Sequence, residues 1–153
     1  MDITIKNLQT KIPIRLPRIR SVVRRTFRHL RINNAELSIV FVTPLRMRSI
    51  NAQYLKHDYV TDVLTFDYSP AVRRKLGVKK KSSPSSFVHG EIVICPSEAL
   101  RNAQVLELSV HQEIELYAIH GILHLMGYDD HAPKEIARMR KKEREIMELI
   151  VHG

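Results

Sequence analysis

Three histidines in the C-terminal third of the sequence have the type and spacing that a metal site requires: His120, His124 and His131. The first two lie four residues apart in an apolar run that ends at Gly127, and we predict that this run is a helix. Residues four apart share one face of a helix, with Cβ atoms about 5–6 Å apart. Two imidazoles at this spacing can both reach one zinc ion at about 2.0–2.1 Å. His120 and His124 are therefore predicted to converge.

A third ligand is expected from the residues that follow the helix. A glycine just past a helix can adopt the left-handed conformation that ends the helix and turns the chain back. Gly127 is placed to do this, and His131 would then be carried towards the first two histidines. Three protein ligands leave one position for water, which is typical of a catalytic rather than a structural zinc site. The sequence thus predicts one catalytic Zn²⁺ per chain.

Other interpretations of these histidines are weaker or are excluded. A pair of histidines four apart in an apolar helix often only packs in the core, but the glycine and the third histidine favour a metal site. In the HExxH metalloproteases the first histidine is followed by a glutamate that acts as general base. Here that position is Gly121, so a peptidase is not expected. His89 and His111 are interpreted as surface or packing residues.

The charge balance favours a polyanionic partner. The 153 residues include 25 Lys and Arg against 16 Asp and Glu, which gives a net charge of +9. Such an excess attracts nucleic acid by releasing condensed counterions, although many basic proteins use it only to stay soluble. The hydrophobic share of 44% is ordinary for a globular protein, and the length suits one domain spanning residues 1–153.

The sequence predicts a soluble cytoplasmic protein without a membrane partner. Its apolar runs fall short of the ~20 residues that a bilayer span needs, and its first residues lack a basic segment followed by an apolar one. Cys95 is the only cysteine, and its apolar surroundings indicate a small buried side chain.

Hydrophobic periodicity predicts alternating strands and helices. The predicted strands cover residues 2–8, 37–42, 61–66 and 87–94, and the predicted helices cover 16–30, 44–54, 96–105, 109–126 and the region from 133 onwards. Residues 69–86 are rich in Lys, Arg and Ser and are expected to form a mobile basic loop that joins two strands of a hairpin. Asp62, at the start of a strand, is expected either to cap a turn or to face a site.

With its strands, helices and motifs in this order along the sequence, the chain resembles the YbeY family of bacterial metal-dependent endoribonucleases, also described as rRNA maturation factors. Three segments carry the resemblance: Asn51-Ala52-Gln53-Tyr54 through Thr61-Asp62-Val63-Leu64-Thr65-Phe66, then Gly90-Glu91-Ile92-Val93-Ile94-Cys95-Pro96, then His120 to Asp129 with the following histidine. The resemblance implies an α/β (α+β) fold, in which a small central mixed β-sheet of about four strands packs with helices. It places the metal site on a helix in the C-terminal half and on the turn that follows.

The resemblance also implies a function. Members of the family hold zinc on three histidines and cleave single-stranded RNA. This cleavage contributes to maturation of the 16S rRNA 3′ end and to ribosome quality control. RNA would be the principal partner, with the ribosome or ribosomal proteins as further partners.

Two positions depart from the family pattern. The family usually has its third histidine ten residues after the first, where this chain has Asp130, so that His131 comes one residue later. An aspartate oxygen is also an acceptable zinc ligand. The family commonly has an arginine where this chain has Leu55. Lys56 can replace it as a point charge but not as a bidentate fork, and Arg48 is a second candidate for steadying the scissile phosphate.

Three hypotheses follow. The first is metal-assisted phosphodiester hydrolysis, in which zinc on His120, His124 and His131 lowers the pKa of a bound water from 15.7 towards about 7 or polarises a phosphoryl oxygen. The second is a non-catalytic rRNA or ribosome assembly factor with a structural metal, which a fourth ligand such as Asp129 or Asp130 would favour. The third is a hydrolase of another ester.

Overall fold

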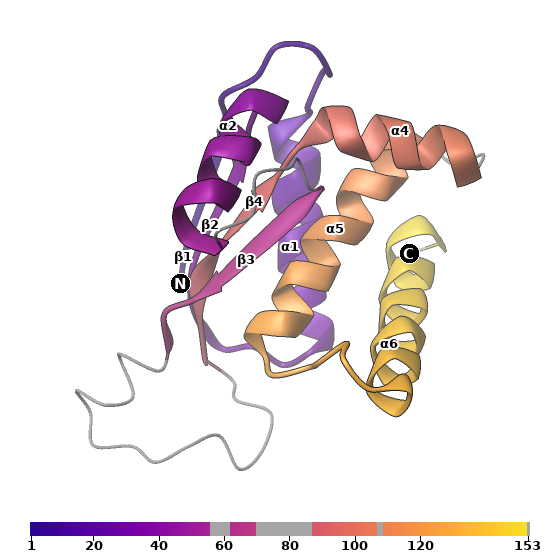
Figure 1. Ribbon diagram of the computed structural model, residues 1–153. Coiled ribbons are helices and arrows are strands. Elements are labelled where there is room, and N and C mark those ends of the chain that lie inside the picture. The colour runs from indigo at the N-terminus through magenta and orange to yellow at the C-terminus, as the bar shows by residue number, and fades with distance from the viewer. Residues whose placement is uncertain (56–61, 70–86, 107–108, 153) are drawn as a thin grey trace.

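The computed structural model describes residues 1–55, 62–69, 87–106 and 109–152. A four-stranded sheet lies between helices on both of its faces (Figure 1). Lys56 and residues 70–86 of the predicted basic loop lie outside the described residues. Within the part of the chain that is described, no helix is both long and apolar enough to cross a membrane.

The sheet is mixed, as expected. Its strands are β1 (Asp2–Asn7), β2 (Asn34–Phe41), β3 (Val63–Asp67) and β4 (Phe87–Ile94), in the spatial order β1-β2-β4-β3. Strands β1, β2 and β4 are parallel, and β3 runs antiparallel to β4. In this register Ile5, Ile39 and Ile92 lie side by side across three strands. The predicted α/β fold and the predicted pairing of the last two strands are both confirmed, and β3 forms an edge of the sheet.

One face of the sheet is covered by α1 (Leu16–His29) and α5 (Val110–Leu125), as Figure 1 shows. Ile19 and Phe27 of α1 and Ile122 of α5 are buried in one core with Ile39 and Ile92 of the sheet. A further helix, α4 (Pro96–Leu106), connects β4 to α5 and contributes Ala99 to the same core. The long α6 (Pro133–His152) packs against α5 and α1 rather than on the sheet.

The opposite face carries a smaller apolar cluster under α2 (Pro44–Ile50). Met47 of α2 packs there against Val42, Val93 and Cys95. Cys95 is fully buried, which confirms its predicted place, and burial raises the pKa of its thiol. Because Met47 and the sheet exclude water, this cluster fixes α2 on the face away from α5.

Two boundaries differ from the sequence prediction by three residues or more. Strand β2 begins at Asn34 rather than 37, because residues 34–36 pair with Phe87–His89 of β4 although every second side chain is exposed. The helix predicted over 44–54 is regular only to Ile50 and continues as a π-helical turn, η1 (Asn51–Leu55). Hydrogen bonding between strands and a local change of helical pitch leave little trace in an apolar periodicity.

Candidate metal centre

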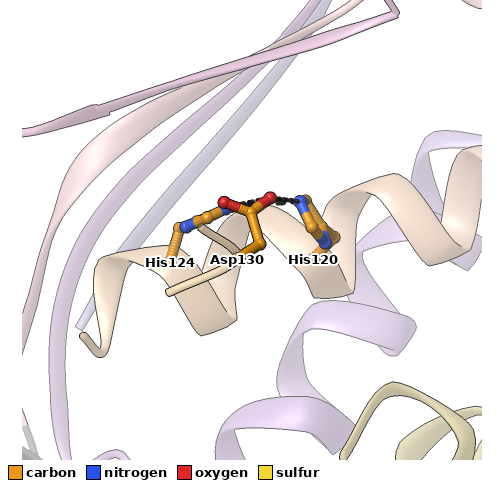
Figure 2. Close-up of side chains that lie close together, drawn as sticks. All are labelled: His120, His124 and Asp130. Carbon is orange, nitrogen blue, oxygen red and sulfur yellow. Dashed lines mark hydrogen bonds and ion pairs between the residues drawn. The ribbon is translucent and has the colours of Figure 1, made fainter. Parts of the chain in front are cut away.

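His120 and His124 lie on one face of α5 and point towards each other, as their spacing predicts (Figure 2). Their Nε2 atoms are 3.0 Å apart and their ring centroids 4.5 Å apart. About a quarter of each side chain is exposed. The helix thus presents two imidazoles side by side to solvent, at the spacing that a shared ion requires.

The hydrogen bonds of the opposite ring nitrogens define which nitrogen of each imidazole is protonated. His124 Nδ1 lies 3.1 Å from the carbonyl oxygen of Tyr128, which only accepts, so Nδ1 carries the proton. His120 Nδ1 lies 2.6 Å from a carboxylate oxygen of Glu143, which acts in the same way. Each Nε2 therefore turns a lone pair towards the other ring, as a metal-binding histidine does.

Asp130 completes the group. Its Oδ2 lies 3.3 Å from His124 Nε2 and 3.7 Å from His120 Nε2, and the three atoms all lie within 4.8 Å of one another (Figure 2). With both imidazole lone pairs turned towards a carboxylate, the group contains no hydrogen-bond donor, and a cation between the three atoms would make their approach favourable. Two histidines and one carboxylate are a donor set that catalytic zinc sites use. These residues therefore fit a divalent metal ion.

The turn after α5 is built by Gly127, as predicted. Its φ of 105° lies in the region that side chains disfavour. The N–H of Gly127 donates to the carbonyl of His124, and the N–H of Tyr128 donates to that of Leu123. This pair of hydrogen bonds is a Schellman motif, which satisfies the last carbonyls of the helix. It carries the Tyr128 carbonyl back onto His124 and brings Asp130 over both imidazoles.

His131 is not brought to this group. Its side chain is 85% exposed, and its Nε2 lies 3.2 Å from Oδ1 of Asp129. The same Asp129 oxygen accepts from the backbone N–H of Asp130, 2.8 Å away. The turn thus points Asp130 inward and holds His131 with Asp129 on the solvent side. The donor atom beside His120 and His124 is therefore that of Asp130, while His131 groups with Asp129 and Asp130; His131 as third ligand stays a prediction.

A cavity of about 410 Å³ opens beside the three donor atoms. It is lined by Asp62, Val63, Leu64, Thr65, Asp67, His120, His124 and Asp130. Asp62 faces the site as a lining residue of this cavity, and its carboxylate is held in place: Oδ1 accepts from the Val63 N–H and Oδ2 from the Asn102 side chain. Asn102 also bonds to the hydroxyl of Tyr117, whose pKa is raised by burial. This chain of contacts fixes the wall of the cavity opposite the histidines.

The two candidate phosphate-binding residues lie elsewhere or are not described. Arg48 is an exposed residue of α2, on the opposite face of the sheet from α5, and it is not among the described residues that line the cavity. Lys56 is outside the described part of the chain. Their proposed contribution to catalysis stays a prediction.

Gly121, the residue that replaces the glutamate of HExxH, faces the sheet. A Cβ at this position would lie 2.7 Å from Cδ1 of Ile92, so α5 and β4 approach too closely for a side chain. A glutamate here would be directed into the core rather than towards the histidines. The structure thus gives a second reason to exclude metallopeptidase chemistry of that type.

Sequence reasoning missed one residue of the centre, Glu143. It lies 23 positions after His120, in a heavily charged segment of α6. The sequence does carry a signal for Glu143, because this charged residue lies between Met139 and Ile146 on the apolar face of an amphipathic helix. A charged residue on such a face needs a buried partner.

Nearly the whole chain matches a known protein family. Residues 4–151 match the family described as Endoribonuclease YbeY. The chain belongs to this family. It is 36% identical over its full length to the Endoribonuclease YbeY of Syntrophus aciditrophicus, of which it covers 91%, and 32% identical over 98% of its length to that of Geobacter metallireducens, of which it covers 96%.

The fold of this chain is also seen in a solved structure. The solution structure of a Thermotoga maritima protein superposes with a TM-score of 0.67 at 25% identity, covering 97% of this chain and 88% of that one. The match to the family and to its named members confirms the resemblance inferred from the three sequence segments.

Proposed function

We propose that this protein is a zinc-dependent endoribonuclease that cleaves single-stranded RNA in the cytoplasm during ribosomal RNA processing, with a part in 16S rRNA 3′ end maturation and ribosome quality control. Its relatives are named Endoribonuclease YbeY. The observation that carries the proposal is the convergence of three lone-pair atoms, from His120, His124 and Asp130, beside an open cavity.

His120, His124 and Asp130 would hold the ion. When bound, zinc would supply a Lewis acid for a phosphoryl oxygen and lower the pKa of a water molecule. Asp130 occupies the position of the family's usual third histidine, and its carboxylate would offset one of the two positive charges. We therefore propose Asp130 rather than His131 as the third donor.

The charges of the cavity explain why a cation is needed for RNA binding as well as for chemistry. Among its described lining residues are three aspartates, Asp62, Asp67 and Asp130, and no lysine or arginine. Hydrogen bonds from Val63 and Asn102 spread the charge of Asp62, and those from Ser69 do the same for Asp67. The remaining negative potential would repel a phosphodiester unless a cation were present. The net charge of +9 would attract RNA over longer distances.

The alternative, an assembly factor with a closed structural metal, requires a fourth protein ligand. The Asp129 carboxylate is the nearest candidate in sequence, but it is engaged by the Asp130 N–H and by His131. Three donor atoms beside a cavity favour the catalytic alternative.

The test is cleavage of an end-labelled unstructured RNA by the full chain, with single-stranded DNA and a peptide as parallel substrates. We expect RNA cleavage that is lost on chelation and restored by Zn²⁺. His124→Ala is expected to abolish it while leaving the circular dichroism spectrum unchanged. His111→Ala, at an exposed position of the same helix, is the matched control and should retain activity. Full activity in a metal-free preparation would contradict the proposal.

The third donor is tested by a pair of variants. Asp130→Ala should lose both Zn²⁺ binding and cleavage, and His131→Ala should retain them. The opposite result would assign the third position to His131 and require the turn after Gly127 to rearrange when the ion binds.

A further inference from the structure

Glu143 connects the last helix of the protein to the metal centre. Its Oε1 lies 2.6 Å from Nδ1 of His120, and only 14% of its side chain is exposed. We propose that Glu143 is a positioning residue, whose carboxylate fixes the orientation and the protonated nitrogen of His120. The inference rests on the metal site of the proposed function. It implies that α6 contributes to that site through Glu143.

The apolar packing around Glu143 holds its carboxylate in place. Met139 and Ile146, one turn before and one turn after it on α6, are buried against Ile119 and Leu123 of α5. On α5, Ile119 directly precedes His120 and Leu123 lies about one turn after it. The contact between carboxylate and imidazole therefore lies beside a continuous apolar helix–helix interface, whose packing holds α5 and α6 at a fixed distance from each other.

The two imidazoles are oriented by different means. His124 uses a backbone carbonyl, that of Tyr128, which the Schellman turn supplies. His120 uses a charged side chain from a separate helix. A hydrogen bond to a carboxylate is shorter and stronger than one to a neutral carbonyl, and it raises the basicity of the other ring nitrogen. His120 is thus the ligand whose donor strength depends on tertiary packing.

A purely structural role for Glu143 makes a different prediction. If the carboxylate only joined α6 to α5, its removal would lower the stability of the fold but would not change which nitrogen of His120 is protonated. Removal of such an outer carboxylate from a metal-binding histidine typically costs 10–100-fold in metal affinity. The two roles are therefore separated by measurements on the imidazole and on the ion rather than by activity.

The experiment uses the full chain with Glu143→Ala and Glu143→Gln. Glu148→Gln, an equal loss of charge at an exposed position of the same helix, is the control. Nitrogen NMR of the metal-free proteins, at a pH where free histidine is neutral, reports the protonated nitrogen of each ring. Competition with a chromophoric chelator gives the Zn²⁺ dissociation constant.

We expect Nδ1-protonated His120 and His124 in the unchanged protein and in Glu148→Gln. In Glu143→Ala, His120 should become a mixture of tautomers while His124 stays as it was, and the dissociation constant should rise about 10–100-fold. Glu143→Gln should give a smaller rise, since its amide oxygen still accepts but is neutral. It also provides the decisive comparison if the alanine variant does not fold.

The inference is overturned if Glu143→Ala and Glu143→Gln leave the His120 tautomer unchanged and bind Zn²⁺ as tightly as the unchanged protein. Failure of the proposed function looks different, because the unchanged protein would then bind no Zn²⁺. In that case the tautomers of the metal-free proteins still decide whether Glu143 positions His120.

Discussion

The close approach of α5 to β4 at Gly121 gives a prediction that can be worked out from the structure. An added Cβ would lie 2.7 Å from Cδ1, 2.9 Å from Cγ1 and 3.0 Å from Cγ2 of Ile92. Ile92 is fully buried in the close-packed core, so a movement of its side chain would displace other core atoms. Gly121→Ala must therefore push α5 away from the sheet or distort Ile92.

Two opposing terms determine how much Gly121→Ala changes the free energy of unfolding. Over-packing a core by one methyl group costs about 1–3 kcal/mol, whereas alanine is favoured over glycine in a helix by about 0.8–1.0 kcal/mol. Because three atoms of one immobile side chain are too close, we expect the steric term to dominate. The free energy of unfolding should fall by about 1–2 kcal/mol, which lowers the melting temperature of a domain of this size by about 2–8 °C.

A double-mutant cycle with Ile92→Val isolates this contact. Valine lacks Cδ1, the atom nearest to the added Cβ, and the single change should cost about 0.5–1.5 kcal/mol. In the double variant the new methyl group occupies the space that Cδ1 leaves, so the combined loss should be smaller than the sum by about 0.5 kcal/mol or more. Urea unfolding followed by circular dichroism measures all four proteins.

Ile5→Val is the control for the cycle. Ile5 lies in register with Ile92 but two strands away, about 10 Å at the usual strand spacing. Its effect should add to that of Gly121→Ala without coupling. The reasoning is refuted if Gly121→Ala is as stable as the unchanged protein, or if Ile92→Val and Ile5→Val show equal coupling to it.

Three further predictions concern the turn, the thiol and a surface ion pair. Gly127→Ala should lower stability by about 1–2 kcal/mol because its φ is 105°, and it should weaken Zn²⁺ binding in a chelator competition. Cys95 should resist iodoacetamide in the folded protein and react after unfolding, because burial raises the pKa of its thiol and shields it; rapid alkylation of the native chain would contradict this. Hydrogen bonds from Lys142 and His29 lower the Glu145 pKa from 4.5 to about 2. The stability contributed by Glu145 should therefore be complete above about pH 4.5 and lost as the pH falls towards 2. Because Glu145 is 45% exposed, Glu145→Gln should lower the free energy of unfolding by at most about 1 kcal/mol at neutral pH. The melting temperatures of this variant and of the unchanged protein should become equal in acid, and a difference that persists there would exclude this account.

Features governed by short-range rules were predictable from the sequence. The spacing of His120 and His124 places them on one helical face whatever the rest of the fold does. Gly127 ends that helix because it can adopt a positive φ without steric cost. The four strands follow from apolar patterns, whereas the central mixed sheet was expected from the resemblance to the YbeY family.

Which side chain approaches the two imidazoles could not be predicted in this way. Counting residues after Gly127 leaves Asp130 and His131 equally near, because an irregular turn has no fixed period. The choice depends on the hydrogen bond from the Asp130 N–H to Asp129, which turns one side chain inward and the next outward. Such local bonds of aspartate to the backbone are determined by the turn as a whole.

The sequence by itself thus determined the two imidazoles and the helix that carries them. Only the tertiary structure decided what surrounds them: the carboxylate of Asp130, the cavity wall at Asp62 and the partner Glu143. The physical reason is that the first feature depends on 3.6 residues per turn, whereas the others depend on how the turn after α5 folds back and on how β3 and α6 pack beside α5.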